Sequence, residues 1–335
     1  MDIPQKPYVG RLAPAPTGAL HLGNARTFLV AWLCARKTEG KLLLRLEDLD
    51  HPKVKPQAAQ DAYRDLHWLG LDWDRGPAAA FPPFTDDEPG DPYIQSNRLQ
   101  RYADALRTLR EKNLVYPCVC TRKDLESLHS APNAGEDLHE RRYPGTCRQR
   151  FSSFDDARAA AGTEPAWRFR VADGDVTRFV DAMAGPQESV LSDWSGDFPI
   201  ARGDRASYQL AVVVDDHDMG VTEVVRGDDL LPSTHRQLAL YKALGFEPPR
   251  FRHIPLVVGP DGRRLAKRHG DSRLCVLRQA GRPPERVLGW LAWSCGWLDV
   301  PKEISLAEIA KKCDFTTFPE QRVTVTPDDL KWLGF

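Results

Sequence analysis

Residues 11–24 read RLAPAPTGALHLGN, and the rest of the chain is organised around this stretch. Its turn-forming residues are Pro14, Pro16, Gly18 and Gly23. The prolines exclude regular helix or sheet pairing, and the glycines permit tight turns and close approach of a ligand to the backbone. Apolar residues at helical spacing follow at once and predict a helix that ends near Gly40. A rigid loop therefore delivers His21 to a helix N-terminus, where unpaired N–H groups and the helix dipole favour phosphate.

Strand patterns flank this loop and helix on both sides. Residues 8–12 predict a short strand, and residues 41–47, which read KLLLRLE, predict a buried strand. Strand, loop, helix and strand begin a βαβ unit, so we expect an α/β fold with a Rossmann-like doubly wound parallel sheet. Ligands bind beyond the carboxyl ends of such strands. Glu47 is expected there, where it either pairs with an ammonium group or makes a turn or cap.

The chain has 335 residues and a formal net charge of −1, with 41% hydrophobic and 28% charged residues. This composition is typical of a globular protein with one large domain carrying an insertion, or with two domains. The near-neutral charge argues against a broad electrostatic grip on nucleic acid, so such contacts are expected to be local. No run is long and apolar enough to span a membrane, and MDIPQKPYVG lacks the apolar core of a signal peptide. We therefore expect a cytoplasmic monomer without membrane contact.

Three of the seven cysteines lie in one segment, as Cys118-x-Cys120 and Cys147. Thiolates at positions i and i+2 of a turn can face one metal ion, and a second pair of ligands from a returning strand can complete a tetrahedron. The alternative is that these are unrelated thiols in a reducing compartment. Four protein ligands would leave no open coordination position, so a zinc ion held in this way would be structural.

The second half of the chain carries further strand patterns. Residues 207–216, which read SYQLAVVVDD, predict a buried strand, and residues 221–226 predict another that ends at Arg226. An arginine at a strand end can hold a carboxylate through two parallel hydrogen bonds, or it can form a surface ion pair with one of the two aspartates that follow. The acidic run at residues 215–218 is interpreted either as a metal site or as a turn.

Helix signals and one basic loop complete the pattern. Ser233 or Thr234 is expected to cap a helix. A loop after the next predicted strand carries Lys267, whose charge can stabilise a phosphate group during its transfer. Ser305 and Glu308 form a capping-box pattern before a predicted C-terminal helix.

Taken in order, these motifs resemble those of one enzyme family. Residues 11–24 resemble the first ATP signature, the HIGH loop, of class I aminoacyl-tRNA synthetases, and the RLAPAPTG lead-in points to the glutamyl/glutaminyl branch. Residues 45–50, RLEDLD, resemble R-I-E-D-T-D of that branch, and Lys267 stands in a loop similar to its second signature, the KMSKS loop. The segments YPCVCTR and RRYPGTCR resemble the zinc-binding segment of glutamyl-Q tRNA(Asp) synthetases. The resemblance runs from Tyr8 to about Leu333.

The resemblance implies four parts. Residues 1–110 and 196–272 would form the two halves of a nucleotide-binding catalytic domain. Residues 111–195 would form an insertion that holds zinc and, in the family, contacts the acceptor nucleic acid. Residues 273–335 would form a short helical C-terminal region. A full glutamyl-tRNA synthetase continues into a helical anticodon-binding region, which we expect this chain to lack.

The resemblance also implies the site residues. The residues that would bind ATP, with Mg²⁺ sharing the phosphate charge, are His21, Gly23, Asn24 and Lys267. His21 and Lys267 among them would be catalytic. The residues that would bind glutamate are Arg11, Leu12, Ala13, Pro14, Ala15, Glu47, Tyr208 and Arg226. Glu47 would hold the ammonium group, while Arg11, Tyr208 and Arg226 would hold the side-chain carboxylate. The ligands of one structural zinc would be Cys118, Cys120, Tyr143 and Cys147, with His129 or His139 as alternatives to Tyr143.

The activity implied is ATP-dependent activation of L-glutamate to glutamyl-adenylate. Glutamate would then pass to the queuosine base in the anticodon of tRNA(Asp) rather than to the 3′ end. One alternative is a truncated glutamyl-tRNA synthetase that charges the 3′ end. Another is a non-catalytic tRNA-binding paralogue, which is favoured only by Ala15 and Ala266 standing where the family has serine.

Overall fold

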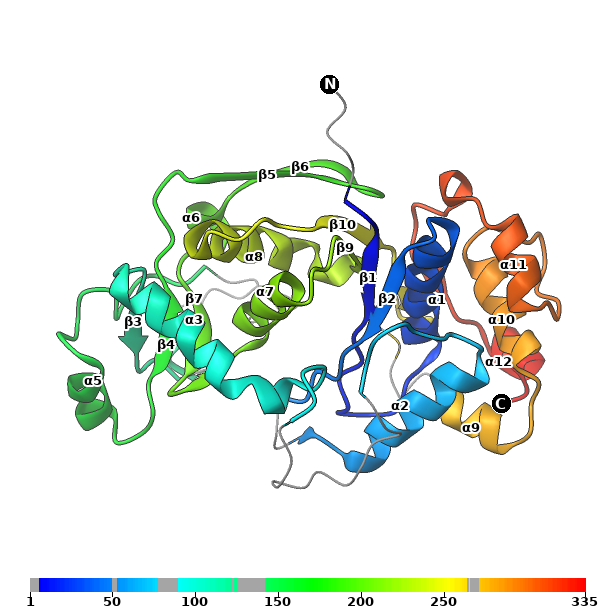
Figure 1. The fold of residues 1–335 in the computed structure, drawn as a ribbon, viewed down its shortest axis with the longest axis horizontal. Coiled ribbons are helices and arrows are strands. Elements are labelled where there is room, and N and C mark those ends of the chain that lie inside the picture. The colour runs from blue at the N-terminus through cyan, green and yellow to red at the C-terminus, as the bar shows by residue number, and fades with distance from the viewer. Residues whose placement is uncertain are drawn as a thin grey trace.

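The computed structural model describes residues 6–49, 53–77, 90–121, 123–125, 142–263, 265 and 271–335. A central α/β body separates two further parts of the chain (Figure 1). Strands β3 and β4 and helix α5 lie at one end, and helices α9 to α12 lie at the other.

The expected βαβ unit is present at the start of the chain. Strand β1 (Val9–Leu12) leads through the proline-containing loop into helix α1 (Leu22–Lys37) and then strand β2 (Lys41–Leu44). The two strands pair in parallel along their whole length. His21 is the N-cap of α1, and the Asn24 side chain accepts a hydrogen bond from the backbone N–H of His21. This capping box fixes the point at which the loop becomes helix.

The other half of the body is a mixed sheet, in the order β6-β5-β10-β9. Strands β9 (Glu223–Gly227) and β10 (Arg250–Ile254) are parallel, and β10 also pairs in parallel with β5 (Val176–Asp181). Strand β6 (Gly185–Val190) forms an antiparallel hairpin with β5. The α/β class is therefore confirmed, but the expected doubly wound parallel sheet is replaced by mixed sheets: β1 and β2 form a parallel pair of their own, and an antiparallel hairpin joins one edge of the other sheet.

The two sheets meet at the start of β1 and β9. The backbone N–H of Thr222 donates to the carbonyl of Val9 at 2.9 Å, and the Val9 N–H donates to the Thr222 hydroxyl at 2.8 Å. Further along, the contact is made by a side chain, since Arg11 Nη1 donates to the carbonyl of Val225 at 2.9 Å. The strand ends are thus bridged by side chains, which leaves room for a ligand between them.

Residues 207–216 form a helix, not the strand that we expected. Helix α7 (Tyr208–Asp218) follows Ser207 and is buried on most of its surface. A short run of apolar residues is compatible with a buried strand or a buried helix, so periodicity cannot separate the two. The next helix, α8 (Leu231–Leu244), begins before Ser233 and Thr234, which therefore lie inside it and do not cap it.

A separate antiparallel sheet combines two strands from residues 111–195 with two strands that follow them, in the order β3-β4-β7-β8. The elements within residues 111–195 that belong to this part are β3 (Val115–Cys118), α5 (Phe154–Ala161), β4 (Ala166–Phe169) and α6 (Leu191–Trp194). The elements η2 (Gln95–Arg98) and α3 (Leu99–Glu111) lead into it, and β7 (Phe198–Arg202) and β8 (Arg205–Ala206) follow. Buried residues of α3, β4 and β7 share one apolar cluster with α7 and α8, so the insertion packs onto the catalytic body.

The C-terminal helices pack against the other side of α1. They are α9 (Leu274–Gln279), α10 (Pro284–Ser294), α11 (Leu306–Lys312) and α12 (Pro327–Leu333), with η6 (Phe315–Thr317) and β12 (Val323–Thr324) between them. Strand β12 pairs in parallel with β11 (Val257–Val258), and the Ser305–Glu308 capping box is confirmed. Helix α2 (Pro56–Trp68) contacts α9 through an ion pair between Asp65 and Arg278 at 2.7 Å.

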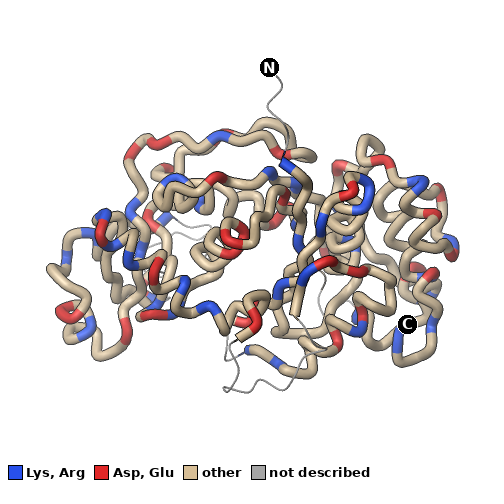
Figure 2. Tube along the Cα trace, in the orientation of Figure 1, with Lys and Arg blue, Asp and Glu red and all other residues tan. Residues whose placement is uncertain are grey.

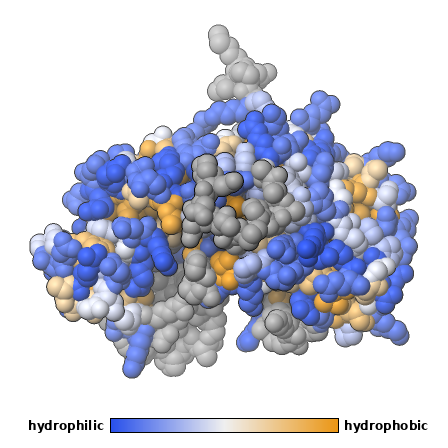
Figure 3. Space-filling model, turned by 60° about the horizontal axis from the view of Figure 1, so that its bottom comes forward, coloured by the Kyte–Doolittle hydropathy of each residue, from blue (hydrophilic) through white to orange (hydrophobic). Residues whose placement is uncertain are grey.

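Acidic and basic residues are interspersed along the fold (Figure 2). The face shown in Figure 3 is mostly hydrophilic, with hydrophobic residues in scattered groups. Within the described part of the chain, no helix has the length and hydropathy needed to cross a membrane.

Candidate functional site

A cavity of about 520 Å³ opens where the two halves of the body meet. Its lining consists of Arg11, Ala13, Pro14, Ala15, Thr17, Gly18, Ala19, Leu20, His21, Gly23, Asn24, Thr27, Phe28, Glu47, Tyr208, Val225, Arg226, Gly227, Asp229, Leu230, Leu256 and Val257. Its size is that of a small-molecule site, and it lies beyond the carboxyl ends of parallel strands. Among the described residues predicted to bind ATP or glutamate, Leu12 is the one that is not in this lining. Leu12 is fully buried in the core, and Lys267 lies outside the described residues.

The first end of the cavity lies at the N-terminus of α1. The Gly23 N–H donates to His21 Nδ1 at 3.1 Å, which holds the imidazole against the first turn of α1. A Cβ on Gly23 would lie 3.0 Å from the His21 ring and 3.6 Å from the Val257 side chain, so glycine keeps this approach close. The first N–H groups of this 16-residue helix are hydrogen-bonded within the protein, that of Leu22 to the Ser272 carbonyl at 3.2 Å and that of Gly23 to His21, so what the helix end offers a ligand is the partial positive charge of its dipole.

The second end carries two buried arginines, Arg11 and Arg226. Arg11 lies 3.7 Å from the Asp216 carboxylate. Arg226 donates to neutral groups, namely His253 Nε2 at 2.9 Å and the Thr234 hydroxyl at 2.7 Å. No carboxylate of a described residue pairs with Arg226, so the surface ion pair considered from the sequence is not formed. A buried guanidinium without a counter-ion favours a ligand carboxylate.

Glu47 lies at the same end, with 11% of its side chain exposed. Arg45 Nη2 donates to its carboxylate at 3.0 Å. Burial raises the pKa of Glu47, and the neighbouring Arg45 and Arg11 charges oppose that rise. This end of the cavity thus holds the Glu47 carboxylate beside two guanidinium groups, a pattern that fits a ligand with both an ammonium and a carboxylate group.

The acidic run at residues 215–218 belongs to a buried ion-pair network. Asp216 accepts from Arg45 Nη1 at 2.7 Å, and Arg45 is fully buried. Asp215 accepts from Arg98 Nε at 2.7 Å and from the Tyr102 hydroxyl at 2.9 Å. These carboxylates are occupied by cations, which favours ion pairing over a metal site and explains how the strand end that carries Glu47 is held against α7.

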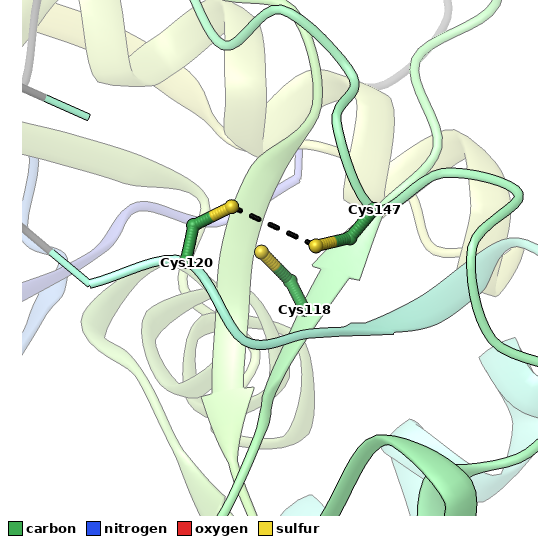
Figure 4. Close-up of side chains that lie close together, drawn as sticks. All are labelled: Cys118, Cys120 and Cys147. Atoms are coloured by element: carbon green, nitrogen blue, oxygen red, sulfur yellow. Dashed lines mark hydrogen bonds between the residues drawn. The ribbon is translucent and has the colours of Figure 1, made fainter. Parts of the chain in front are cut away.

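The cysteine cluster forms a second candidate site. The sulfur atoms of Cys118, Cys120 and Cys147 point toward one another (Figure 4) and lie within 4.8 Å of each other. The Tyr143 hydroxyl lies 3.3 Å from Cys118 Sγ and 3.5 Å from Cys120 Sγ, and Cys120 Sγ lies 3.6 Å from Cys147 Sγ. Zinc–sulfur bonds of about 2.3 Å give a tetrahedron with edges of about 3.8 Å. Three thiols and one phenol therefore fit a tetrahedral zinc ion, while His129 and His139 lie outside the described residues.

Arg168 supports this cluster from one side. Its Nε lies 3.2 Å from Cys118 Sγ, and its guanidinium carbon lies 3.7 Å above the Tyr143 ring. A hydrogen bond from Cys120 holds the pKa of the Cys118 thiol below its usual range against the effect of burial, and the Arg168 charge adds to that lowering. The thiolate is the form that binds metal, so a lowered thiol pKa favours metal binding.

Several lining residues were missed by reasoning from the sequence. Gly227 and Asp229 follow Arg226, and the Asp229 carboxylate lies 2.6 Å from where a Cβ on Gly227 would be. The Gly-Asp-Asp run directly after a predicted strand was the available signal. Leu256 and Val257 had no such signal, because only packing brings them to the cavity.

Comparison with known proteins agrees with this geometry. Residues 8–332 match the family described as "tRNA synthetases class I (E and Q), catalytic domain". The "Glutamyl-Q tRNA(Asp) synthetase" of Symbiobacterium thermophilum is 46% identical over 97% of this chain and 98% of its own length. That of Nitratidesulfovibrio vulgaris is 48% identical over 96% of each chain. "Glutamate--tRNA ligase 2" of Halorhodospira halophila is 39% identical over 97% of this chain and 64% of its own length.

A solved structure shows the same fold. The crystal structure of a glutamate tRNA ligase from Elizabethkingia meningosepticum, in complex with its amino acid, superposes with a TM-score of 0.78 at 25% identity. That likeness covers 98% of this chain and 69% of the other. With a cavity built on the signature loop and a sequence match over nearly its whole length, the chain belongs to the class I tRNA synthetases of the E and Q branch, a family of ligases that act on tRNA.

Proposed function

We propose that this chain activates L-glutamate with ATP to glutamyl-adenylate and transfers the glutamate to the queuosine base in the anticodon of tRNA(Asp). The observation that carries the activation step is the cavity itself, which joins the positive end of the α1 dipole and His21 to two buried arginines and a carboxylate. The queuosine base as acceptor is supported by the names of relatives at 46% and 48% identity that align over nearly their full length.

In the proposed activation step, the α-carboxylate of glutamate attacks the α-phosphorus of ATP in line. A new oxygen–phosphorus bond forms, the bond to the β-phosphate oxygen breaks, and pyrophosphate leaves. The protein contributes position and charge rather than covalent chemistry. His21 and the N-terminus of α1 would hold phosphate oxygens, assisted by Lys267, Gly23 and Asn24, and Mg²⁺ would accompany the ATP.

Glutamate would lie at the second end of the cavity. Arg226, Arg11 and Tyr208 would hold its side-chain carboxylate, and Glu47 would hold its ammonium group. A neutral glutamine would leave the Arg226 guanidinium buried without a counter-ion, which is the physical basis for rejecting it. Ala13, Pro14 and Ala15 would form the backbone wall beside the amino acid.

We further propose one structural zinc per chain, held by Cys118, Cys120, Tyr143 and Cys147. Four protein ligands leave no open position, so this ion would hold the insertion together and take no part in catalysis. We expect the enzyme to work as a cytoplasmic monomer.

The test is transfer of labelled glutamate, with ATP and Mg²⁺, to tRNA pools with and without queuosine. Label confined to queuosine-containing tRNA(Asp) is the expected result. Equal labelling of tRNA(Glu) from both pools would instead indicate charging of the 3′ end, a second candidate that the 39% identity to a glutamate–tRNA ligase favours. Absence of both labelling and glutamate-dependent pyrophosphate exchange would reject both. Glu47→Gln serves as the matched variant, since it should lose exchange while leaving the fold intact.

A further inference from the structure

A buried chain of hydrogen bonds stands behind Arg226, on the side away from the cavity. Asp181 Oδ2 lies 2.6 Å from His253 Nδ1, and both side chains are fully buried. His253 Nε2 in turn accepts from Arg226 Nε at 2.9 Å. These residues come from three neighbouring strands, β5, β10 and β9, of the mixed sheet. None of the motifs that predicted the site includes Asp181 or His253.

We propose that Asp181 and His253 are positioning residues that fix the Arg226 guanidinium for the side-chain carboxylate of the substrate. This inference rests on the proposed role of Arg226 in binding glutamate. It adds two residues that do not line the cavity and that set amino-acid specificity through a third.

The direction of each hydrogen bond is set by Asp181. Its Oδ1 accepts from the backbone N–H groups of Met183 and Ala184, each at 2.9 Å, so Oδ2 is the oxygen that faces the imidazole. A carboxylate can only accept, so Nδ1 of His253 must carry the proton. Nε2 then keeps its lone pair and accepts from Arg226. This is the logic by which a buried aspartate selects a histidine tautomer.

These hydrogen bonds leave one edge of the Arg226 guanidinium group for a ligand. Nε of Arg226 is taken by His253, and Nη2 donates to the Thr234 hydroxyl at 2.7 Å. Nη1 is directed to the cavity side, where its nearest partner is the Tyr208 hydroxyl at 3.5 Å. Two edges of the planar group are therefore anchored, and the remaining donors are oriented in advance.

A neutral imidazole between Asp181 and Arg226 also preserves the charge at the cavity. A carboxylate in direct contact would neutralise the guanidinium and compete with the substrate. Burial holds the pKa of His253 below its usual value; Asp181 opposes this, and the Arg226 and Arg11 charges add to it. His235 on α8 is the other titratable group nearby, and burial lowers its pKa as well. The imidazole therefore stays neutral at physiological pH.

Asp181→Asn tests the inference with almost no change in shape. The amide oxygen would keep the bonds from the Met183 and Ala184 N–H groups, so the amide NH₂ would face His253 Nδ1. The imidazole would then carry its proton on Nε2, opposite the Arg226 Nε–H. Losing a hydrogen bond to a charged group corresponds to about tenfold or more in affinity. In pyrophosphate exchange we expect the KM for glutamate to rise about tenfold or more, the KM for ATP to stay unchanged, and the preference for glutamate over glutamine to fall.

A pair of substitutions at His253 provides a second route if Asp181→Asn does not fold. The amide of His253→Gln can donate to Asp181 and accept from Arg226, so this variant should retain much of the glutamate affinity. His253→Leu can do neither and should lose it. Thr177→Val is the matched control, because Thr177 lies on β5 like Asp181 and its hydroxyl lies 2.6 Å from His235 Nδ1. The substitution removes this buried hydroxyl without touching Arg226.

Each outcome supports or overturns the inference. An unchanged KM for glutamate in folded Asp181→Asn would overturn it, as would an equal rise in Thr177→Val or equal losses in both His253 variants. If the unmodified enzyme shows no glutamate-dependent exchange, the proposed function itself fails, and this inference fails with it. The inference is supported if Asp181→Asn raises the KM for glutamate but not for ATP, and if His253→Gln keeps the glutamate affinity that His253→Leu loses.

Discussion

Tyr143→Phe removes a single oxygen atom from the centre of the cysteine cluster. That oxygen lies 3.3 Å from Cys118 Sγ and 3.5 Å from Cys120 Sγ, in the place of a fourth zinc ligand. A structural zinc site contributes about 10 kcal/mol or more of apparent binding free energy, so one of four ligands accounts for about 2.5 kcal/mol. We therefore expect the variant to bind zinc roughly 70-fold more weakly. The hydroxyl also accepts from the Cys147 N–H at 3.0 Å, and losing this bond should lower the free energy of unfolding by about 1 kcal/mol without metal.

Zinc affinity is measured by competition with a chromophoric chelator, together with the zinc content per chain by elemental analysis. Tyr116→Phe is the matched control, since the Tyr116 hydroxyl is buried in the same cluster but donates to Asp197 at 2.7 Å. It should cost similar stability and leave zinc affinity unchanged. Wild-type affinity in Tyr143→Phe would refute the reasoning and point to His129 or His139 as the fourth ligand. No zinc in the unmodified protein would remove the metal site altogether.

Three further predictions concern the cavity and its supports. Lys267→Ala should slow glutamate-dependent pyrophosphate exchange by more than about tenfold, as expected for one transition-state charge contact, and near-normal exchange would remove Lys267 from the mechanism. Asp215→Ala should lower the free energy of unfolding in urea by about 3–5 kcal/mol, because Arg98 and the fully buried Arg45 lose a counter-ion; a loss below about 1 kcal/mol would show that the network is dispensable. The two buried histidines should also contribute stability that is lost on acidification, because burial holds the pKa values of His253 and His235 below the unfolded value of about 6.5. A histidine whose pKa is lower in the folded state than in the unfolded state contributes stability that is fully present above the unfolded pKa. This contribution is lost as the pH falls toward the folded pKa. Between about pH 7 and pH 5, the urea midpoint of the unmodified protein should therefore fall relative to that of His253→Gln; a midpoint with equal pH dependence in both proteins would argue against this origin.

Features coded in neighbouring residues were predictable from the sequence. The prolines and glycines of residues 11–24, the helix after them and the Ser305–Glu308 capping box depend on turn chemistry and on contacts within a few residues. The Cys-x-Cys spacing likewise marked a candidate metal cluster, because two of its cysteines are separated by a single residue. Family resemblance added roles for Arg11, Glu47 and Arg226, and the structure brings all three to one cavity.

Other features depended on contacts between distant parts of the chain. Residues 207–216 were expected to form a strand, since an apolar run has no periodicity that distinguishes a buried strand from a buried helix. The sequence left open whether their carboxylates form a metal site. In the structure these carboxylates pair with Arg45 and Arg98, which lie more than a hundred residues away in the chain. The mixed sheet likewise required the β5–β6 hairpin to reach β10.

The sequence by itself therefore determined the local motifs and, through them, the kind of chemistry this protein performs. Only the tertiary structure decided how that chemistry is held in place, through the Asp181–His253–Arg226 chain and the buried ion pairs around Arg45. The physical reason is that turns, caps and adjacent ligands depend on short-range geometry, which is written in consecutive residues. The ionisation state and orientation of a buried charge depend instead on which distant groups share its low-dielectric surroundings.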